Sequence, residues 1–267
     1  MVYIETVATH FNITHDLKEV VSDPTLRRRM SRIVKMATAT AFECAGGVQG
    51  IADLDAIVTA TGLGCLADSE RFLEQVHRMG GQMLNPTPFI QSTFNTVGAQ
   101  IALLAKNQCY NMTYVHRGRS FESALLDAML QLQEKDARRV LVGAFDENTP
   151  TQHHIMQRMG FWRHAEDGEG VMFTLVTAEA SQNSIAKISK IDFLSSPLSE
   201  QKCVQKYANR PDTQVWYETE KEKTVYPCRS AMRFARAVEE IRRGVPEVVI
   251  YNEYFGKEPT VIVLQCL

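Results

Sequence analysis

Residues 114–120 read Tyr-Val-His-Arg-Gly-Arg-Ser, and this stretch decides how the surrounding chain is expected to fold. A strand-like run ends here in a sharp turn, and a helix is expected from Ser120 to Gln133. Its apolar stripe consists of Phe121, Ala124, Leu125, Ala128 and Leu132. Many α/β enzymes present a nucleophile at such a strand–turn–helix elbow, because the tight turn pushes one side chain toward the substrate. Here the apex is Gly118, flanked by Arg117 and Arg119, so the sequence predicts the scaffold for covalent chemistry without the covalent group.

Composition excludes several classes of protein. Hydrophobic residues make up 45% of the 267 residues and charged residues 22%, as in an ordinary globular protein. The 29 basic and 31 acidic residues give a net charge of −2, which argues against a general nucleic-acid binder. No apolar run approaches the roughly 20 residues that span a membrane, and residues 1–5 do not resemble a signal peptide. We therefore expect a cytoplasmic protein.

The cysteines and histidines do not indicate a metal site. The six cysteines are scattered and form no Cys-x-x-Cys pair, whereas zinc sites normally need closely spaced ligands. His153 and His154 are adjacent, and adjacent residues of a helix point in different directions. We expect free thiols, ordinary histidines, and neither a metal nor another cofactor.

Strands that alternate with helices predict an α/β fold with a largely buried sheet. The order of strand, loop, helix, strand, helix and strand occurs in the first part of the chain and again, shortened, after residue 185. This pattern predicts a first half at 1–180 and a truncated second half at 185–267, which together form one compact unit. One helix is expected at 26–44, and residues 85–89, with Pro86 and Pro88, are expected to form an irregular loop.

From residue 88 onward the chain resembles a β-ketoacyl synthase of the thiolase superfamily. Residues 88–95, Pro-Phe-Ile-Gln-Ser-Thr-Phe-Asn, are similar to the Pro-Phe…Ser-Thr…Asn segment that leads into a Gly/Ala-rich helix in that family. The family continues with a strand and an elbow of the type Thr-Ala-Cys-Ala/Thr-Ser. An ungapped comparison from Asn95 places Gly118 at the nucleophilic cysteine, and a shift of one residue would place Arg117 or Arg119 there. The resemblance implies a thiolase-like layered α-β-α-β-α fold with a shortened C-terminal half.

The histidines of the family are also missing from this chain. Residues 228–239 resemble the segment that carries Gly-His…Gly-Ala-Ala-Gly, and the histidine position falls near Ser230. The family's His-Gly-Thr motif has no counterpart, because His164 is the last histidine. Condensation needs a thiolate to carry the acyl group, and the two histidines normally stabilise the enolate. The resemblance therefore implies that no residue of this chain catalyses condensation.

One subgroup of the family fits these departures: the short chain-length factors paired with ketosynthases in aryl polyene and related pathways. The resemblance implies a heterodimer with an active ketosynthase in polyene, fatty-acyl or polyketide elongation, or a homodimer, formed through the strand before the elbow. The interface candidates are Asn111, Met112, Thr113, Tyr114 and Val115. An acidic acyl carrier protein is a further candidate partner for the basic residues Arg27, Arg28, Arg29, Arg32 and Lys35, which alternatively form a solvated helix face.

Several side chains have two interpretations. Phe89, Ile90 and Phe94 lie where ketosynthases line the acyl tunnel, or they belong to the core. The side chains around the apex, which are His116, Arg117 and Arg119, fill the vestigial pocket, reach the partner, or form internal salt bridges.

Two other functions remain open on the sequence. One is a divergent acyl transferase or thiolase-like enzyme that uses Cys109, although this thiol precedes the strand and is more typical of an ordinary cysteine. The other is a homodimeric acyl-binding protein. Ser120, at the start of the helix, is expected to act as a helix cap rather than as a nucleophile.

Overall fold

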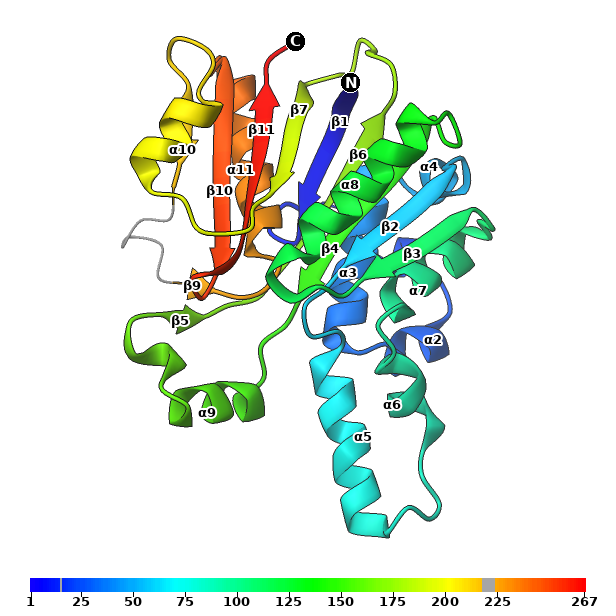
Figure 1. Ribbon diagram of the computed structural model, residues 1–267. Coiled ribbons are helices and arrows are strands. Elements are labelled where there is room, and N and C mark those ends of the chain that lie inside the picture. Colours follow the sequence, from blue (N-terminus) through cyan, green and yellow to red (C-terminus); the bar gives the residue numbers. More distant parts are fainter. Residues whose placement is uncertain (15, 218–223) are drawn as a thin grey trace.

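The computed structural model describes residues 1–14, 16–217 and 224–267, which form a nine-stranded mixed sheet covered by helices (Figure 1). The strands lie in the spatial order β3 (Tyr110–Tyr114), β2 (Ala56–Ala60), β4 (Arg139–Asp146), β6 (Gly170–Thr177), β1 (Val2–Thr9), β7 (Ala186–Phe193), β11 (Lys257–Gln265), β10 (Glu247–Tyr254) and β8 (Gln214–Trp216). Strand β2 pairs in parallel with β3 and β4, and β10 with β8, whereas the other neighbours are antiparallel. The strand before the elbow, β3, is therefore an edge strand.

Each half of this sheet lies between two apolar clusters, because successive side chains of a strand point to opposite faces. In β4, Val142 packs into the central apolar cluster while Leu141 packs into an outer one. In β10, Ile250 faces the central cluster while Val249 faces a third cluster. The helices α3 (Arg32–Ala45) and α7 (Thr96–Ala105) cover the outer face of the first half, α8 (Ser120–Gln133) and α11 (Arg229–Arg242) lie in the centre, and α10 (Glu200–Tyr207) covers the second half. The expected α-β-α-β-α layers are thus present.

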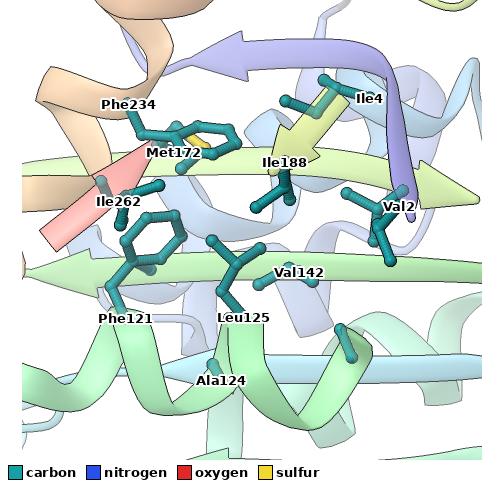
Figure 2. Packing of buried hydrophobic residues seen from close by; sticks show 14 of the residues in the cluster. Val2, Ile4, Phe121, Ala124, Leu125, Val142, Met172, Ile188, Phe234 and Ile262 are labelled. Carbon is teal, nitrogen blue, oxygen red and sulfur yellow. The ribbon is translucent and has the colours of Figure 1, made fainter. Parts of the chain in front are cut away.

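The central cluster joins the two halves of the chain (Figure 2). Phe121 of α8 and Phe234 of α11 meet edge to face, with ring centroids 5.4 Å apart. Residues of the first half, such as Val2 and Val142, pack around them together with Ile262 of the second half. The two sheet layers are also continuous through a short pairing of β1 with β7.

The strand order agrees with the expected internal repeat. Helix α8 precedes β4, which pairs with β6, and β6 pairs in turn with β1; helix α11 precedes β10, which pairs with β11, and β11 pairs in turn with β7. On its other side β4 is followed by β2 and β3, whereas β10 is followed by β8. Counted over the described residues, the second unit is therefore shorter by one strand. The boundaries at 1–180 and 185–267 stay a prediction.

The remaining elements lie mostly outside these layers. They are α1 (Leu17–Val20), α2 (Pro24–Arg29), α4 (Val48–Ala52), α5 (Leu66–Met79), α6 (Pro86–Gln91), α9 (Pro150–Arg158), the paired strands β5 (Glu166–Asp167) and β9 (Thr224–Val225), and the 3-10 turns η1 (Arg117–Arg119) and η2 (Phe161–Arg163). Helix α5 projects away from the sheet, with α6 beside it (Figure 1).

Two predicted elements were wrong. The segment at 85–89 is the start of helix α6, because the Asn85 side chain accepts a hydrogen bond from the Thr87 N–H at 3.0 Å and Pro86 occupies the first helical position. The single helix predicted at 26–44 is instead two helices, α2 and α3, since Met30 between them is extended.

The described structure contains no feature of a metal centre or a membrane span. All six cysteines are free. Within residues 1–14, 16–217 and 224–267, no group of three His, Cys, Asp or Glu side chains could hold a metal ion. In the same ranges no helix combines the length and the apolar character needed to cross a bilayer.

The Phe121–Phe234 contact predicts where the fold is most sensitive to substitution. Phe234→Ala removes a fully buried ring, so we expect the free energy of unfolding in urea to fall by about 3–5 kcal/mol. The control Val204→Ala, on the exposed face of α10, should change it by less than about 0.5 kcal/mol. Equal effects of the two substitutions would contradict a central core shared by both halves.

Candidate functional site

The elbow between β3 and α8 is a strained turn closed by its own hydrogen bonds. Arg117 has φ of +51°, in the left-handed region that is unfavourable for a residue with a side chain. The Ser120 hydroxyl accepts a hydrogen bond from the His116 N–H and donates one to the Arg117 carbonyl, both at 2.8 Å. Arg119, not Ser120, occupies the cap position of α8, so the predicted capping role of Ser120 was wrong. The hydroxyl holds the turn and is engaged on both sides.

Gly118 at the apex is buried against the tip of the hairpin formed by β10 and β11. Its N–H donates to Glu258 Oε2 at 3.2 Å, and its carbonyl accepts from Asn252 Nδ2 at 3.2 Å. A Cβ added at Gly118 would lie 2.3 Å from the Cβ of Tyr254, closer than any real contact. The space that a nucleophilic side chain would need is therefore filled by the protein itself. Sequence reasoning missed these hairpin residues, because they are more than 130 positions away.

The three polar side chains around the apex have different environments. Arg119 turns inward: its guanidinium donates to the Leu194 carbonyl at 2.6 Å and lies over the Phe193 ring, 5.9 Å from the ring centroid. His116 Nδ1 lies 3.0 Å from Ser123 Oγ. Arg117 is exposed. Arg119 therefore ties the elbow to the second half, whereas His116 and Arg117 remain at the surface.

Behind the apex lies a buried carboxyl group that the sequence analysis did not identify. Glu122 of α8 is fully buried, and its Oε1 accepts hydrogen bonds from Thr260 Oγ1 at 2.9 Å and from Asn252 Nδ2 at 3.3 Å. Ser230, at the predicted lost histidine position on α11, lies near the same carboxyl, but among the described residues neither its hydroxyl nor Glu122 Oε2 has a hydrogen-bond partner. Burial is the largest effect and raises the pKa of Glu122. The sequence signal that could have revealed Glu122 is its position directly after Phe121, the first residue of the apolar stripe of this helix.

A second buried carboxylate holds the loops around the elbow. Asp146, at the end of β4, accepts hydrogen bonds from the Thr61 hydroxyl at 2.9 Å and from the Gly62 N–H at 2.8 Å. Its other oxygen accepts from the N–H of Cys228, at the start of α11, at 2.8 Å. Burial raises the pKa of Asp146, and these donors oppose the shift. The carboxylate thereby fixes three chain segments relative to one another.

The tunnel candidates are exposed rather than part of the core. Phe89 is 54% exposed, Ile90 61% and Phe94 48%. Phe94 packs against Gly64, where an added Cβ would lie 2.7 Å from the ring. A Cβ added at Gly62, two residues before Gly64, would lie 3.6 Å from Arg117 Cα. The loop at 62–64 therefore links the Phe94 ring to the elbow. The interpretation of these three side chains as core was wrong.

The interface candidates form the outer edge of the sheet. Asn111 and Met112 of β3 are exposed, and Thr113, Tyr114 and Val115 are partly exposed. The Asn111 side chain donates to the Gly98 carbonyl of α7 at 2.9 Å, and the hydroxyls of Thr113 and Thr59 lie 2.7 Å apart. The strand is well attached on its inner side, and its outer side presents unpaired backbone groups.

Cys109 lies in the loop before β3, at the end of the strand opposite to the elbow. The five residues of β3 separate the two positions by roughly 17 Å. Burial raises the pKa of the Cys109 thiol, which disfavours the reactive thiolate. The thiol is therefore remote from the elbow and not activated.

The packing of the apex predicts strong coupling between Gly118 and Tyr254. Gly118→Ala should lower the free energy of unfolding by about 1–3 kcal/mol, because the new Cβ meets the Tyr254 Cβ. In a Tyr254→Gly background the same change should cost much less, and a double-mutant cycle of urea unfolding measures the difference. Additive effects would show that the hairpin does not occupy the apex.

The burial of Glu122 predicts a pH effect of defined sign. Its pKa is higher in the folded chain than in the unfolded one, so its contribution to stability falls as pH rises past the unfolded value of about 4.3. Glu122→Gln removes the ionisation and keeps an acceptor for Thr260, so the variant should be more stable than the wild type at pH 7 by about 1 kcal/mol or more, with a flatter pH profile. Urea unfolding between pH 4 and pH 8 measures this. The exposed Glu134→Gln is the control, and a steeper profile for Glu122→Gln would contradict the assignment.

Comparisons with known proteins identify the family. A comparison with curated proteins finds no match. Among solved structures, the ishigamide ketosynthase/chain length factor is 13% identical, with a TM-score of 0.75 over 100% of this chain and 99% of that chain. The ketosynthase (ApeO) in complex with its chain length factor (ApeC) from Xenorhabdus doucetiae is 15% identical, with a TM-score of 0.64 over 99% and 98% of the two chains. The complex of AntDE with AntF, described as a type II PKS acyl-carrier protein with its ketosynthase, is 10% identical, with a TM-score of 0.78 over 100% and 99%. These likenesses establish the thiolase-like fold, and because residues 13–225 match the family described as beta-ketoacyl synthase, N-terminal domain, the chain belongs to the β-ketoacyl synthase family.

Proposed function

We propose that this chain is a non-catalytic, chain-length-factor-like subunit that pairs with an active ketosynthase during polyene, fatty-acyl or polyketide elongation. The observation that carries the proposal is the filled apex: Gly118 replaces a nucleophile, and Tyr254 occupies the space where its side chain would lie. The nearby polar groups Glu258 and Asn252 bind the Gly118 backbone rather than face an open site. In this proposal the elbow is a structural element of the fold and not a catalytic one.

The edge strand β3 supplies the surface for the partner. An exposed edge with apolar side chains invites pairing with another strand. Met112 of β3 is 42% exposed, and Leu103 of the neighbouring helix α7 is 71% exposed. An interface along this edge would bury both side chains and continue the sheet into the partner. The similarity to structures described as a ketosynthase with its chain length factor supports this arrangement.

The exposed apolar residues on helix α6 and just after it fit a role in lining the path of the acyl chain. Phe89 and Ile90 lie on α6, and Phe89 packs against Phe72 of α5 with ring centroids 5.2 Å apart. Apolar side chains that are exposed on the isolated chain can line an interface or a binding site once a partner covers them. We assign to Phe89, Ile90 and Phe94 the lining of a tunnel that the two subunits share.

An acyl carrier protein is the proposed third component. Of the basic residues on α2 and α3, Arg28 and Arg29 are exposed, whereas Arg32 is bound to Glu169 at 2.6 Å, and Arg27 donates to the Ser22 carbonyl at 2.9 Å. The freely exposed pair provides a small basic surface for an acidic partner.

Pairing with a ketosynthase is tested by co-expression with the ketosynthase of the same pathway. We expect a one-to-one complex by size exclusion with light scattering, and elution as separate monomers would overturn the proposal. Met112→Lys should reduce the recovered complex at least tenfold, because it places a charge on the pairing edge. Val204→Lys on α10, with 41% exposure against 42% for Met112, is the matched control and should leave the complex intact.

The absence of acyl chemistry on this chain is tested separately. After incubation of the complex with an acyl carrier thioester, intact mass should show an acyl adduct on the ketosynthase and none on this chain. A stable adduct on this chain that disappears in Cys109→Ser would instead establish the alternative enzyme.

A further inference from the structure

The pairing edge carries one acidic group next to the middle of β3. Tyr110 and Tyr114, at the two ends of the strand, lie on the same face because they are four residues apart. The Tyr110 hydroxyl donates to Asp127 Oδ2 of α8 at 3.1 Å. Desolvation raises the pKa of Tyr114, and the negative charge of nearby Asp127 raises it further. Asp127 therefore lies between the two tyrosines, level with Met112.

A pairing of two copies of this chain would bring two of these carboxylates together. Antiparallel pairing of β3 with a second β3 about a twofold axis places Met112 against its equivalent and Tyr110 against the second Tyr114. The twofold axis would place both Asp127 groups on the same face of the joined sheet, each beside the Tyr110 of its own β3. Like charges in a partly desolvated interface repel one another.

Within residues 1–14, 16–217 and 224–267, Asp127 forms no ion pair with a lysine or an arginine. Arg117 follows β3 but is five residues from Met112, roughly 16 Å along an extended strand. His116 is closer, yet its ring already contacts Ser123 of its own chain. Among the described residues, the Tyr110 hydroxyl donates to the Asp127 carboxylate, and Tyr114 lies close enough to sense its charge.

From this geometry we infer that Asp127 selects the partner: it disfavours a homodimer and requires a lysine or arginine on the partner's edge, opposite the middle of β3. This inference rests on the proposed pairing through β3. A partner cation would neutralise Asp127 beside the Tyr110 hydroxyl, next to the exposed Met112 of the same edge. The charge thereby supplies specificity, by repelling a second copy and attracting the ketosynthase.

The experiment compares Asp127→Asn with Glu134→Gln, which removes one negative charge from the exposed end of the same helix. Analytical ultracentrifugation of the chain alone should show weak self-association that Asp127→Asn strengthens about tenfold and Glu134→Gln leaves unchanged. With the co-expressed ketosynthase, Asp127→Asn should weaken the complex about tenfold, or about 1.4 kcal/mol. Asp127→Lys should abolish that complex.

The outcomes separate this inference from the proposed function. A wild-type chain that does not pair with the ketosynthase overturns the proposed function. If the wild type pairs, an Asp127→Asn variant with unchanged self-association and unchanged pairing overturns the inference alone. A stable wild-type homodimer that Asp127→Asn weakens would also overturn it. Circular dichroism of each variant establishes that the fold is intact.

Discussion

The contact between Gly118 and Tyr254 is the constraint on which the rest of the site depends. With 2.3 Å between the Tyr254 Cβ and a Cβ built on Gly118, only glycine fits at the apex. The same approach lets the hairpin reach the Gly118 backbone through Asn252 and Glu258. The hairpin of the second half therefore occupies the space that a side chain at the apex would need. A cysteine at this position would meet the hairpin before it met a substrate.

Two buried carboxyl groups give this closed elbow its stiffness. Asp146 connects the loop after β2 to the start of α11, and Glu122 connects α8 to the strands of the hairpin. Burial of a carboxylate is unfavourable unless hydrogen bonds compensate it. Asp146 accepts hydrogen bonds on both oxygens, whereas among the described residues Glu122 accepts them on Oε1 alone. Such groups often serve catalysis where they face a cleft. Here each one faces only protein, which is consistent with a structural role.

How far the sequence predicted this structure depends on the range of the interactions. The helix at Ser120–Gln133 and the strand before it were predicted correctly, because apolar spacing and turn residues are local signals. Helix α6 was missed because two prolines suggested a loop, although Asn85 and Pro86 together make a helix start. The occupants of the apex, Tyr254 and Glu258, could not be predicted, since hydrophobic periodicity does not encode contacts over such separations. Asp127 was missed because only the packing of α8 against β3 brings it close to the two tyrosines.

The strained turn at Arg117 links the closed site to the proposed interface. A left-handed residue with a side chain costs about 1–2 kcal/mol and persists only where its surroundings compensate it. The bonds of Ser120 to the flanking backbone provide that compensation. The result of the turn is geometric: it reverses the chain so that α8 lies along β3 and Asp127 reaches Tyr110. The elbow thus sets the position of α8 against the edge of the sheet, and it places Tyr110 and Asp127 beside the proposed interface.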